Sequence, residues 1–453
     1  MELFPRLSEA LDSLIEGDVY HGDLFVQSAV SHSLQFDDGA LEEISSSAAE
    51  GLSFRLLQGE NSLFAHFSGN DEATAFSAMG AVAERAERAF PARSLSREAI
   101  LPPLPPITPP NADFLRQMDG LARRESPLVR QVSLRLSLSR KKILVFGPSG
   151  ALSEDERSYG NFTVHVIVEK EGSLQTGHEV QAAQTEPDAF LRELRPEEVL
   201  LSALRRALLM LEASACPAGT MPVVLSGQAG GTMIHEACGH GLEADIIQKD
   251  FSVYRNSLGE IVASPLVTLV DDPTLVGHYG SYGYDDEGFR TERTTLIEGG
   301  VLKGFLTDIQ TSRRGGLPRT GNGRRQSYRS LPQPRMSNTF ILPGRDDPAT
   351  LIDSVKKGLL VVKMGGGEVD PTTGNFVFQV TEGYLIEKGN VSKPVRGALL
   401  TGNGPEALRD IRAVGSDLHF EPGFCGKGGQ SVPVTDGQPS LLIGGLVVGG
   451  SDT

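Results

Sequence analysis

The sequence predicts an α+β protein, with mixed α/β N-terminal and central regions followed by a β-rich C-terminal domain that carries a short histidine-containing helix. Three observations support this class. Strand-like alternation and amphipathic helices share the chain up to about residue 215. Six prolines within residues 101–110 divide that part in two. From residue 216 onward, short apolar runs are separated by glycine, which supplies 52 of the 453 residues.

The length, net charge, apolar runs and cysteine count of the chain limit the classes of protein to which it can belong. The length allows two or three domains, each with its own core. A net charge of -16 argues against nucleic-acid binding, because a phosphate-binding surface needs clustered Lys and Arg. No apolar run is long enough to span a membrane. Three cysteines are too few for a disulfide framework and indicate a reducing compartment, so we expect a cytoplasmic protein.

The N-terminal α/β region covers residues 1–100. Residues 1–18 place apolar side chains at helical spacing and include acids, which is typical of an amphipathic helix and not of a signal peptide. Residues 23–67 alternate in short segments separated by turns, so we expect a meander of strands. Residues 71–90 then predict a helix with one apolar side.

Residues 101–110, with the sequence LPPLPPITPP, form the predicted linker, because proline removes backbone donors that helices and central strands need. The central α/β region follows at 111–215. Its pattern predicts a helix at 111–126, strands at 128–139, 141–147 and 161–172, and a strong helix at 195–215. The remaining residues, 216–453, form the predicted C-terminal domain, which is rich in short strands.

The segment MIHEACGHGLEAD, residues 233–245, carries two histidines five positions apart. On an ideal α-helix such a pair lies about 140° apart, too far to share one small ion. A π-type turn brings the two positions together, and such turns favour functional sites. Glycines on both sides of His240 relax the backbone there. We therefore predict a widened or terminating helical turn between Ala237 and His240.

Chemistry suggests the roles of these side chains. Two neutral imidazoles, His235 and His240, can bind a divalent metal, with a third protein ligand and a water completing the set. The metal lowers the pKa of that water and polarises a carbonyl. Glu236 can then act as general base and pass the proton to the leaving amine. The alternative is a pair of structural histidines near a helix end.

The third ligand has four candidates. Cys425 lies in a glycine-rich stretch far along the chain and can approach from another element. Cys238 follows His235 by three residues and could reach the same ion. Glu243 and Asp245 come directly after the motif. Spacing alone does not decide among them, although His and Cys together are typical of catalytic zinc.

A basic segment, NGRRQSYRSLPQPRMSN at residues 322–338, provides a candidate substrate-binding loop. Arg324, Arg325 and Arg335 could present a guanidinium fork to a substrate carboxylate. The alternative is a solvated basic loop without a ligand.

Seven segments occur along the chain in the order HEACGHGLEAD, YDDEG, LIEGGVLKGFL, TGNGRRQSYRSLPQPRMSNTFILPG, GGGEVD, FVFQVTEGYLIEKG and CGKGGQSVPV. Together they resemble the TldD branch of the TldD/PmbA metalloprotease family, in which they occur in the same order. The resemblance is dense over residues 220–453 and looser before them. Many relatives carry a different small residue at Cys238, which leaves its role open.

The resemblance implies a metal-dependent peptidase that hydrolyses short or unfolded peptides. It implies that His235, His240 and Cys425 bind one divalent metal per active site and that Glu236 is catalytic. Zn²⁺ suits this ligand set, with Fe²⁺ as the alternative. It also implies a dimer, either a homodimer or a heterodimer with a TldE/PmbA-like subunit, that encloses the peptide.

Two rival functions follow from the same residues. The chain could be a non-catalytic scaffold or binding subunit, as TldE-type partners are, although those lack the histidine and glutamate set. Alternatively, Cys238 and Cys425 could form a redox-active thiol pair.

Overall fold

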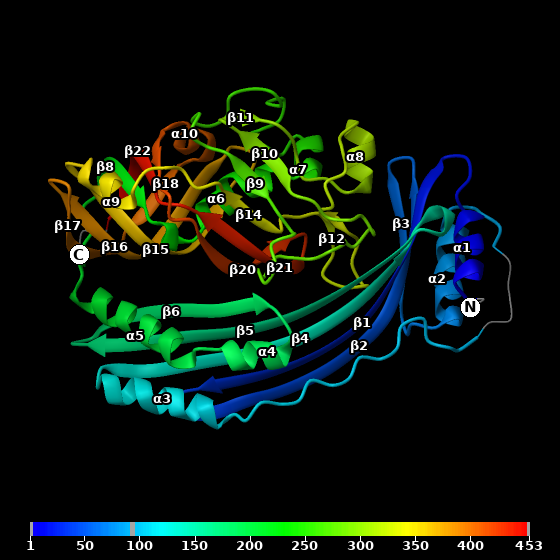
Figure 1. Ribbon diagram of the computed structural model, residues 1–453, viewed down its shortest axis with the longest axis horizontal. Coiled ribbons are helices and arrows are strands. Elements are labelled where there is room, and N and C mark those ends of the chain that lie inside the picture. Colours follow the sequence, from blue (N-terminus) through cyan, green and yellow to red (C-terminus); the bar gives the residue numbers. More distant parts are fainter. Residues whose placement is uncertain (1–2, 91–95, 451–453) are drawn as a thin grey trace.

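Six strands form one antiparallel sheet that curves beneath the C-terminal part of the chain (Figure 1). The computed structural model describes residues 3–90 and 96–450. The strand order is β3-β2-β1-β4-β5-β6, so the segments before and after the proline-rich stretch each contribute three strands. The strands are β1 (Val19–Asp37), β2 (Ala40–Gln58), β3 (Asn61–Ser68), β4 (Val129–Phe146), β5 (Leu152–Lys170) and β6 (Ser173–Gln184).

One face of this long sheet packs on helices. Side chains of alternate strand residues, such as Leu134, Leu136 and Phe162, are buried against α3 and α5. A second cluster packs α1 and α2 against the other end of the sheet. The opposite face, which we call the inner face, lies toward the C-terminal part. The helices of this half are α1 (Leu3–Asp12), α2 (Glu72–Arg85), η1 (Pro148–Gly150), α3 (Asp113–Glu125), α4 (Pro187–Glu193) and α5 (Pro196–Glu212).

The predicted helices 111–126 and 195–215 are confirmed as α3 and α5. The strands of the central region differ in length from the predicted ones. The stretches 128–139 and 141–147 belong to one strand, β4, because its backbone pairs without interruption from Gln131 to Phe146 with β5. Strand β6 was not predicted, because its polar sequence shows no apolar alternation.

The C-terminal part contains two larger sheets and a two-stranded one. The sheet that carries the site has the order β11-β10-β9-β14-β21-β20, with β20 at one edge. In the other large sheet, β15-β8-β22-β18-β16 closes on itself through pairing of β15 with β16, and β17 and β7 extend it. The fold is thus α+β, as the sequence predicts. The strands are β7 (Ser214–Ala215), β8 (Gly219–Leu225), β9 (Leu269–Asp271), β10 (Thr294–Glu298), β11 (Val301–Leu302), β12 (Gly323–Arg324), β13 (Gln333–Pro334), β14 (Asn338–Ile341), β15 (Lys357–Val369), β16 (Asn375–Glu387), β17 (Asn390–Arg396), β18 (Leu399–Asn403), β19 (Ile411–Val414), β20 (His419–Lys427), β21 (Gln430–Gln438) and β22 (Leu441–Gly449).

Short helical segments lie between these sheets. The histidine segment runs through α6 and its continuation, inside the largest hydrophobic cluster. Across the described ranges 3–90 and 96–450, no helix is both long and apolar enough to cross a bilayer. The segments are η2 (Gly227–Ala229), α6 (Thr232–Ile234), η3 (His235–Gly239), η4 (His240–Leu242), α7 (Ala244–Gln248), α8 (Ile309–Gly315), α9 (Pro348–Asp353) and α10 (Gly404–Arg409).

Candidate metal centre

The histidine segment is a chain of short helical turns whose middle turn is widened. Segment α6 is α-helical, η3 is a π-helical turn, and η4 is a 3₁₀ turn. The His240 N–H donates to the His235 carbonyl, five residues back. The widening expected from the sequence is therefore present. It brings the two rings to a centroid distance of 5.0 Å, at an interplanar angle of 88°.

Gly239 is required inside this turn by a close approach. A Cβ placed on Gly239 would lie 1.9 Å from the Met336 sulfur, far inside van der Waals contact. Met336 is fully buried, so it has little room to move. The glycine therefore allows the π turn to pack directly against the chain just before β14.

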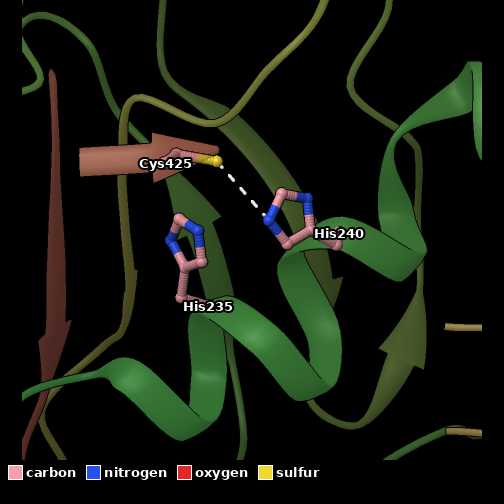
Figure 2. A group of neighbouring side chains, drawn as sticks. All are labelled: His235, His240 and Cys425. Atoms are coloured by element: carbon pink, nitrogen blue, oxygen red, sulfur yellow. Dashed lines mark hydrogen bonds between the residues drawn. The ribbon is translucent and has the colours of Figure 1, made fainter. Parts of the chain in front are cut away.

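Cys425 completes the group from β20. Its sulfur lies 3.4 Å from His240 Nε2, and one ligand atom from each of the three residues lies within 4.8 Å of the others. Figure 2 shows both rings and the sulfur pointing toward one another from the helix and the strand. No other group of three or more potential ligands of this kind occurs in the part of the chain that the structure describes.

Carboxylates hold the far nitrogen of each ring. His235 Nδ1 lies 2.7 Å from Asp436 Oδ1 on β21. His240 Nδ1 lies 2.9 Å from Glu243 Oε2, which also lies 3.0 Å from the ammonium of Lys427. With Nδ1 donating to a carboxylate, Nε2 of each ring is left as the metal-binding atom. Glu243 thus supports His240 instead of joining the ligand group.

The electrostatic surroundings of His235, His240 and Cys425 favour the binding of a cation. Burial disfavours the thiolate of Cys425, but the two histidine rings outweigh it and lower the pKa of Cys425 to about 5. Burial lowers the pKa of His235, whereas Asp436 and Cys425 raise it well above 6.5. Likewise Glu243 outweighs burial and raises the pKa of His240 to about 10. An ionised sulfur and two rings that attract positive charge fit a divalent metal.

Glu236 lies beside this group. Its side chain lines a cavity of about 310 Å³ together with His240, Glu243 and Cys425. Burial raises the pKa of Glu236, and the neighbouring His235 and His240 offset part of that rise. The carboxylate is therefore available to a molecule in the cavity and is a better proton acceptor than an exposed glutamate.

The other candidate ligands are placed elsewhere. Cys238 is fully buried in the hydrophobic core, and burial raises its pKa to about 12, so it stays a protonated thiol. Asp245 accepts from Lys427 Nζ at 2.6 Å. Neither belongs to the converging group.

The three arginines proposed from the sequence are buried. Arg335 is 0% exposed and donates to the Cys425 carbonyl. Arg324 donates to the carbonyls of Met336 and Pro433. Arg325 pairs with Asp23 on β1. In this structure they fix the loop and β20, and their contact with substrate stays a prediction.

The residues that support the candidate ligands, Asp436 and Lys427, could not be predicted from the sequence. Asp436 lies 201 positions from His235, and only the pairing of β21 with β14 and β20 brings it close. The only feature of the sequence that could have pointed to Lys427 is its position two residues after Cys425.

Family models match nearly the whole chain. The model described as PmbA/TldA metallopeptidase C-terminal domain matches residues 218–450. The models for domain 1 and for the central domain of the same metallopeptidases match residues 22–90 and 101–211.

Relatives of known name agree with these matches. The chain is 37% identical to the Metalloprotease TldD homolog of Haemophilus influenzae, over 98% of this chain and 96% of that protein. It is 34% identical to the homologue of the same name from Buchnera aphidicola subsp. Schizaphis graminum, over 97% and 95%. It is 35% identical to the Zinc metalloprotease TldD homolog of Saccharolobus solfataricus, over 56% and 57%.

A solved structure supports the fold. TldE from Thermococcus kodakarensis superposes with a TM-score of 0.76 at 18% identity, and the match covers 98% of this chain and 99% of that one. At this identity the likeness concerns the fold alone.

Proposed function

The chain belongs to the TldD/PmbA family of metallopeptidases, and we propose that it hydrolyses short or unfolded peptides with Glu236 as general base. The observation that carries the proposal is the convergence of His235, His240 and Cys425 within 4.8 Å, beside a cavity that Glu236 also lines. These three residues would hold one divalent metal. When bound, such a metal supplies Lewis-acid polarisation of the scissile carbonyl and an acidic water near neutral pH.

The protein's own side chains perform the proton transfers in this proposal. The Glu236 carboxylate accepts the proton of the attacking water and delivers it to the nitrogen of the leaving amine. Asp436 and Glu243 hold the two imidazoles in the tautomer that presents Nε2 to the site. Zinc is the metal that this donor set favours, with iron(II) as the alternative, and one relative is named a zinc metalloprotease.

The substrate would bind in an extended form. Strand β20, which carries Cys425, is an edge strand, so one side of its backbone has no strand partner in the described chain. An extended peptide can pair with such an edge through main-chain hydrogen bonds, which do not depend on sequence. A folded protein could not present its backbone in this way.

We infer that the chain works as a dimer, with a copy of itself or with a TldE/PmbA-like subunit, as its membership of the TldD/PmbA family implies. The three cysteines are free, in line with a cytoplasmic location. A non-catalytic scaffold role is disfavoured by the complete set of site residues. A thiol pair of Cys238 and Cys425 is disfavoured by the buried, protonated state of Cys238.

Peptide digestion under metal control tests the proposal. Hydrolysis of an unstructured peptide should stop with chelator, return with Zn²⁺ or Fe²⁺, and be lost in Glu236→Gln, while that variant keeps its metal content and its circular dichroism. Thiol–disulfide turnover without metal would instead support the redox alternative. Undiminished hydrolysis by Glu236→Gln would remove Glu236 from the mechanism.

A further inference from the structure

A second cavity lies on the far side of β20 from the metal centre. It has a volume of about 600 Å³ and separates the inner face of the long sheet from the β20–β21 hairpin. Figure 1 shows β20 and β21 above β5 and β6 of that sheet. None of the three candidate metal ligands lines this cavity.

Neutral hydrogen-bonding groups dominate the sheet side of the cavity. In register across β4 and β5, Ser133 lies beside His165 and Ser137 beside Asn161, with Thr163 between the two rows. Hydroxyl, amide and imidazole groups can each donate or accept. Such a wall can pair with both the N–H and the C=O groups of a peptide, whatever its side chains are.

The histidines of this wall do not add charge at neutral pH. His165 and His178 are cross-strand neighbours, with ring centroids 4.4 Å apart. Loss of hydration, together with the neighbouring His165, lowers the pKa of His178 to about 4, and loss of hydration also lowers the pKa of His165. Among the described side chains that line the cavity, Arg135 alone is charged at pH 7.

Phe424 connects this cavity with the metal centre. It precedes the ligand Cys425 on β20, and its side chain lines both cavities. Its ring is 60% exposed although it contacts Tyr279 at a centroid distance of 5.4 Å. A bound chain that covered this ring would bury apolar surface within one residue of the metal site.

We propose that the cavity between the inner face and β20–β21 binds the part of an unfolded peptide substrate that flanks the scissile bond. The peptide passes around the free edge of β20, over Phe424, and then runs along β5. From Asn161 to His165 the wall spans five residues, and the four steps between them measure about 13 Å at about 3.3 Å per residue. It therefore holds about four extended residues. This inference rests on the proposed peptidase function.

The test compares peptides of increasing length with two threonine variants. KM of the metal-loaded enzyme should fall about tenfold as one flank of a synthetic peptide grows by about four residues, and should then stay level. Thr163→Trp fills the cavity and should abolish this gain with little change in kcat on a peptide without the flank. Thr176→Trp is the matched control, because Thr176 is exposed on the same face but outside the cavity.

Each outcome decides the proposal. A length dependence that survives in Thr163→Trp, or is lost equally in Thr176→Trp, would overturn it while leaving the peptidase function intact. If Thr163→Trp does not fold by circular dichroism, Ser137→Trp takes its place. If the wild type cleaves no peptide, the peptidase function fails, and the cavity is tested alone by fluorescence anisotropy. A labelled, unstructured peptide of about twelve residues should then bind the wild type and Thr176→Trp but not Thr163→Trp; equal binding by all three overturns the subsite.

Discussion

We expect Asp436 to strengthen metal binding, although it is not one of the three converging residues. Its carboxylate holds His235 Nδ1 at 2.7 Å and so keeps Nε2 directed into the site. Asp436→Asn removes the negative charge and weakens this support. We expect the dissociation constant for Zn²⁺ to rise about 10- to 100-fold, as is typical when such partners of metal-binding histidines are removed. Competition with a chromophoric chelator measures the constant.

Asp410→Asn is the control for that measurement. Asp410 is a partly exposed surface carboxylate that pairs only with neighbouring Arg412 among the described ion pairs. Its variant should bind Zn²⁺ as the wild type does. An unchanged dissociation constant in Asp436→Asn would show that the carboxylate does not support the ligand.

At the residue scale, the sequence pointed to the candidate metal ligands but not to the carboxylate of Asp436 that holds one of their rings. The spacing of His235 and His240 marked them as a candidate ligand pair. Cys425 was one of four candidates for the third ligand until the family resemblance favoured it. Asp436 is one of 58 acidic residues and lies on a distant strand, so nothing marked it. The arginines of residues 322–338 suggested a basic loop because burial cannot be read from a charged, proline-containing stretch.

At the scale of elements, local geometry was predictable where it follows from a fixed helical period. The five-residue spacing of the histidines requires a wider turn if both rings are to share an ion, and η3 is such a turn. The contact that makes Gly239 necessary there was not predictable, since Met336 comes from another part of the chain.

Strand extent was less predictable than helix position. Lys141 and Lys142 interrupt the apolar alternation of β4, yet the strand continues because its backbone pairs through both residues with β1 on one side and β5 on the other. Strand β6 is an edge strand that packs α5 on one face and lines the large cavity on the other, so neither face needs a continuous apolar pattern.

At the scale of the whole molecule, buried ion pairs join the long sheet to the C-terminal part. Arg55 Nε lies 2.7 Å from Asp23, and its Nη2 lies 2.8 Å from Glu287. Arg325 Nη2 lies 3.2 Å from the other oxygen of Asp23. These four side chains are buried and come from both halves of the chain. Their pairing fixes how the inner face approaches the site.

Asp23→Asn should destabilise this junction in a pH-dependent manner. Burial opposes ionisation of Asp23, but Arg55, with His21 and Arg325, holds its pKa well below the ordinary 3.8. Stability from a lowered carboxyl pKa is present above pH 3.8 and is lost as the pH falls below it. We expect the variant to lose about 3–5 kcal/mol of unfolding free energy at pH 7, because two buried arginines lose a charge partner. The difference from wild type should narrow at pH 3.

Urea unfolding at the two pH values measures this difference. Asp18→Asn serves as control, because Asp18 is 62% exposed where it pairs with Arg88. It should change stability by no more than about 0.5 kcal/mol at either pH. A difference for Asp23→Asn that stays constant between pH 7 and pH 3 would contradict the role given to its charge.

The arrangement of the long sheet and the C-terminal part relative to each other could not be predicted from the sequence. Alternation predicts strands, but it does not give the order β3-β2-β1-β4-β5-β6 or the side of the sheet on which the C-terminal part lies. The cavity beside Phe424 depends on both, since its walls come from strands more than 200 residues apart.

We expect the imidazoles of His235 and His240 and the sulfur of Cys425 to hold one cation. X-ray absorption of the zinc-loaded protein tests it directly. The spectrum should contain one sulfur at about 2.3 Å and nitrogens at about 2.0–2.1 Å. The sulfur signal should vanish in Cys425→Ala and persist in Cys238→Ala. A wild-type spectrum without sulfur, or a sulfur signal lost only in Cys238→Ala, would show that Cys425 is not a metal ligand.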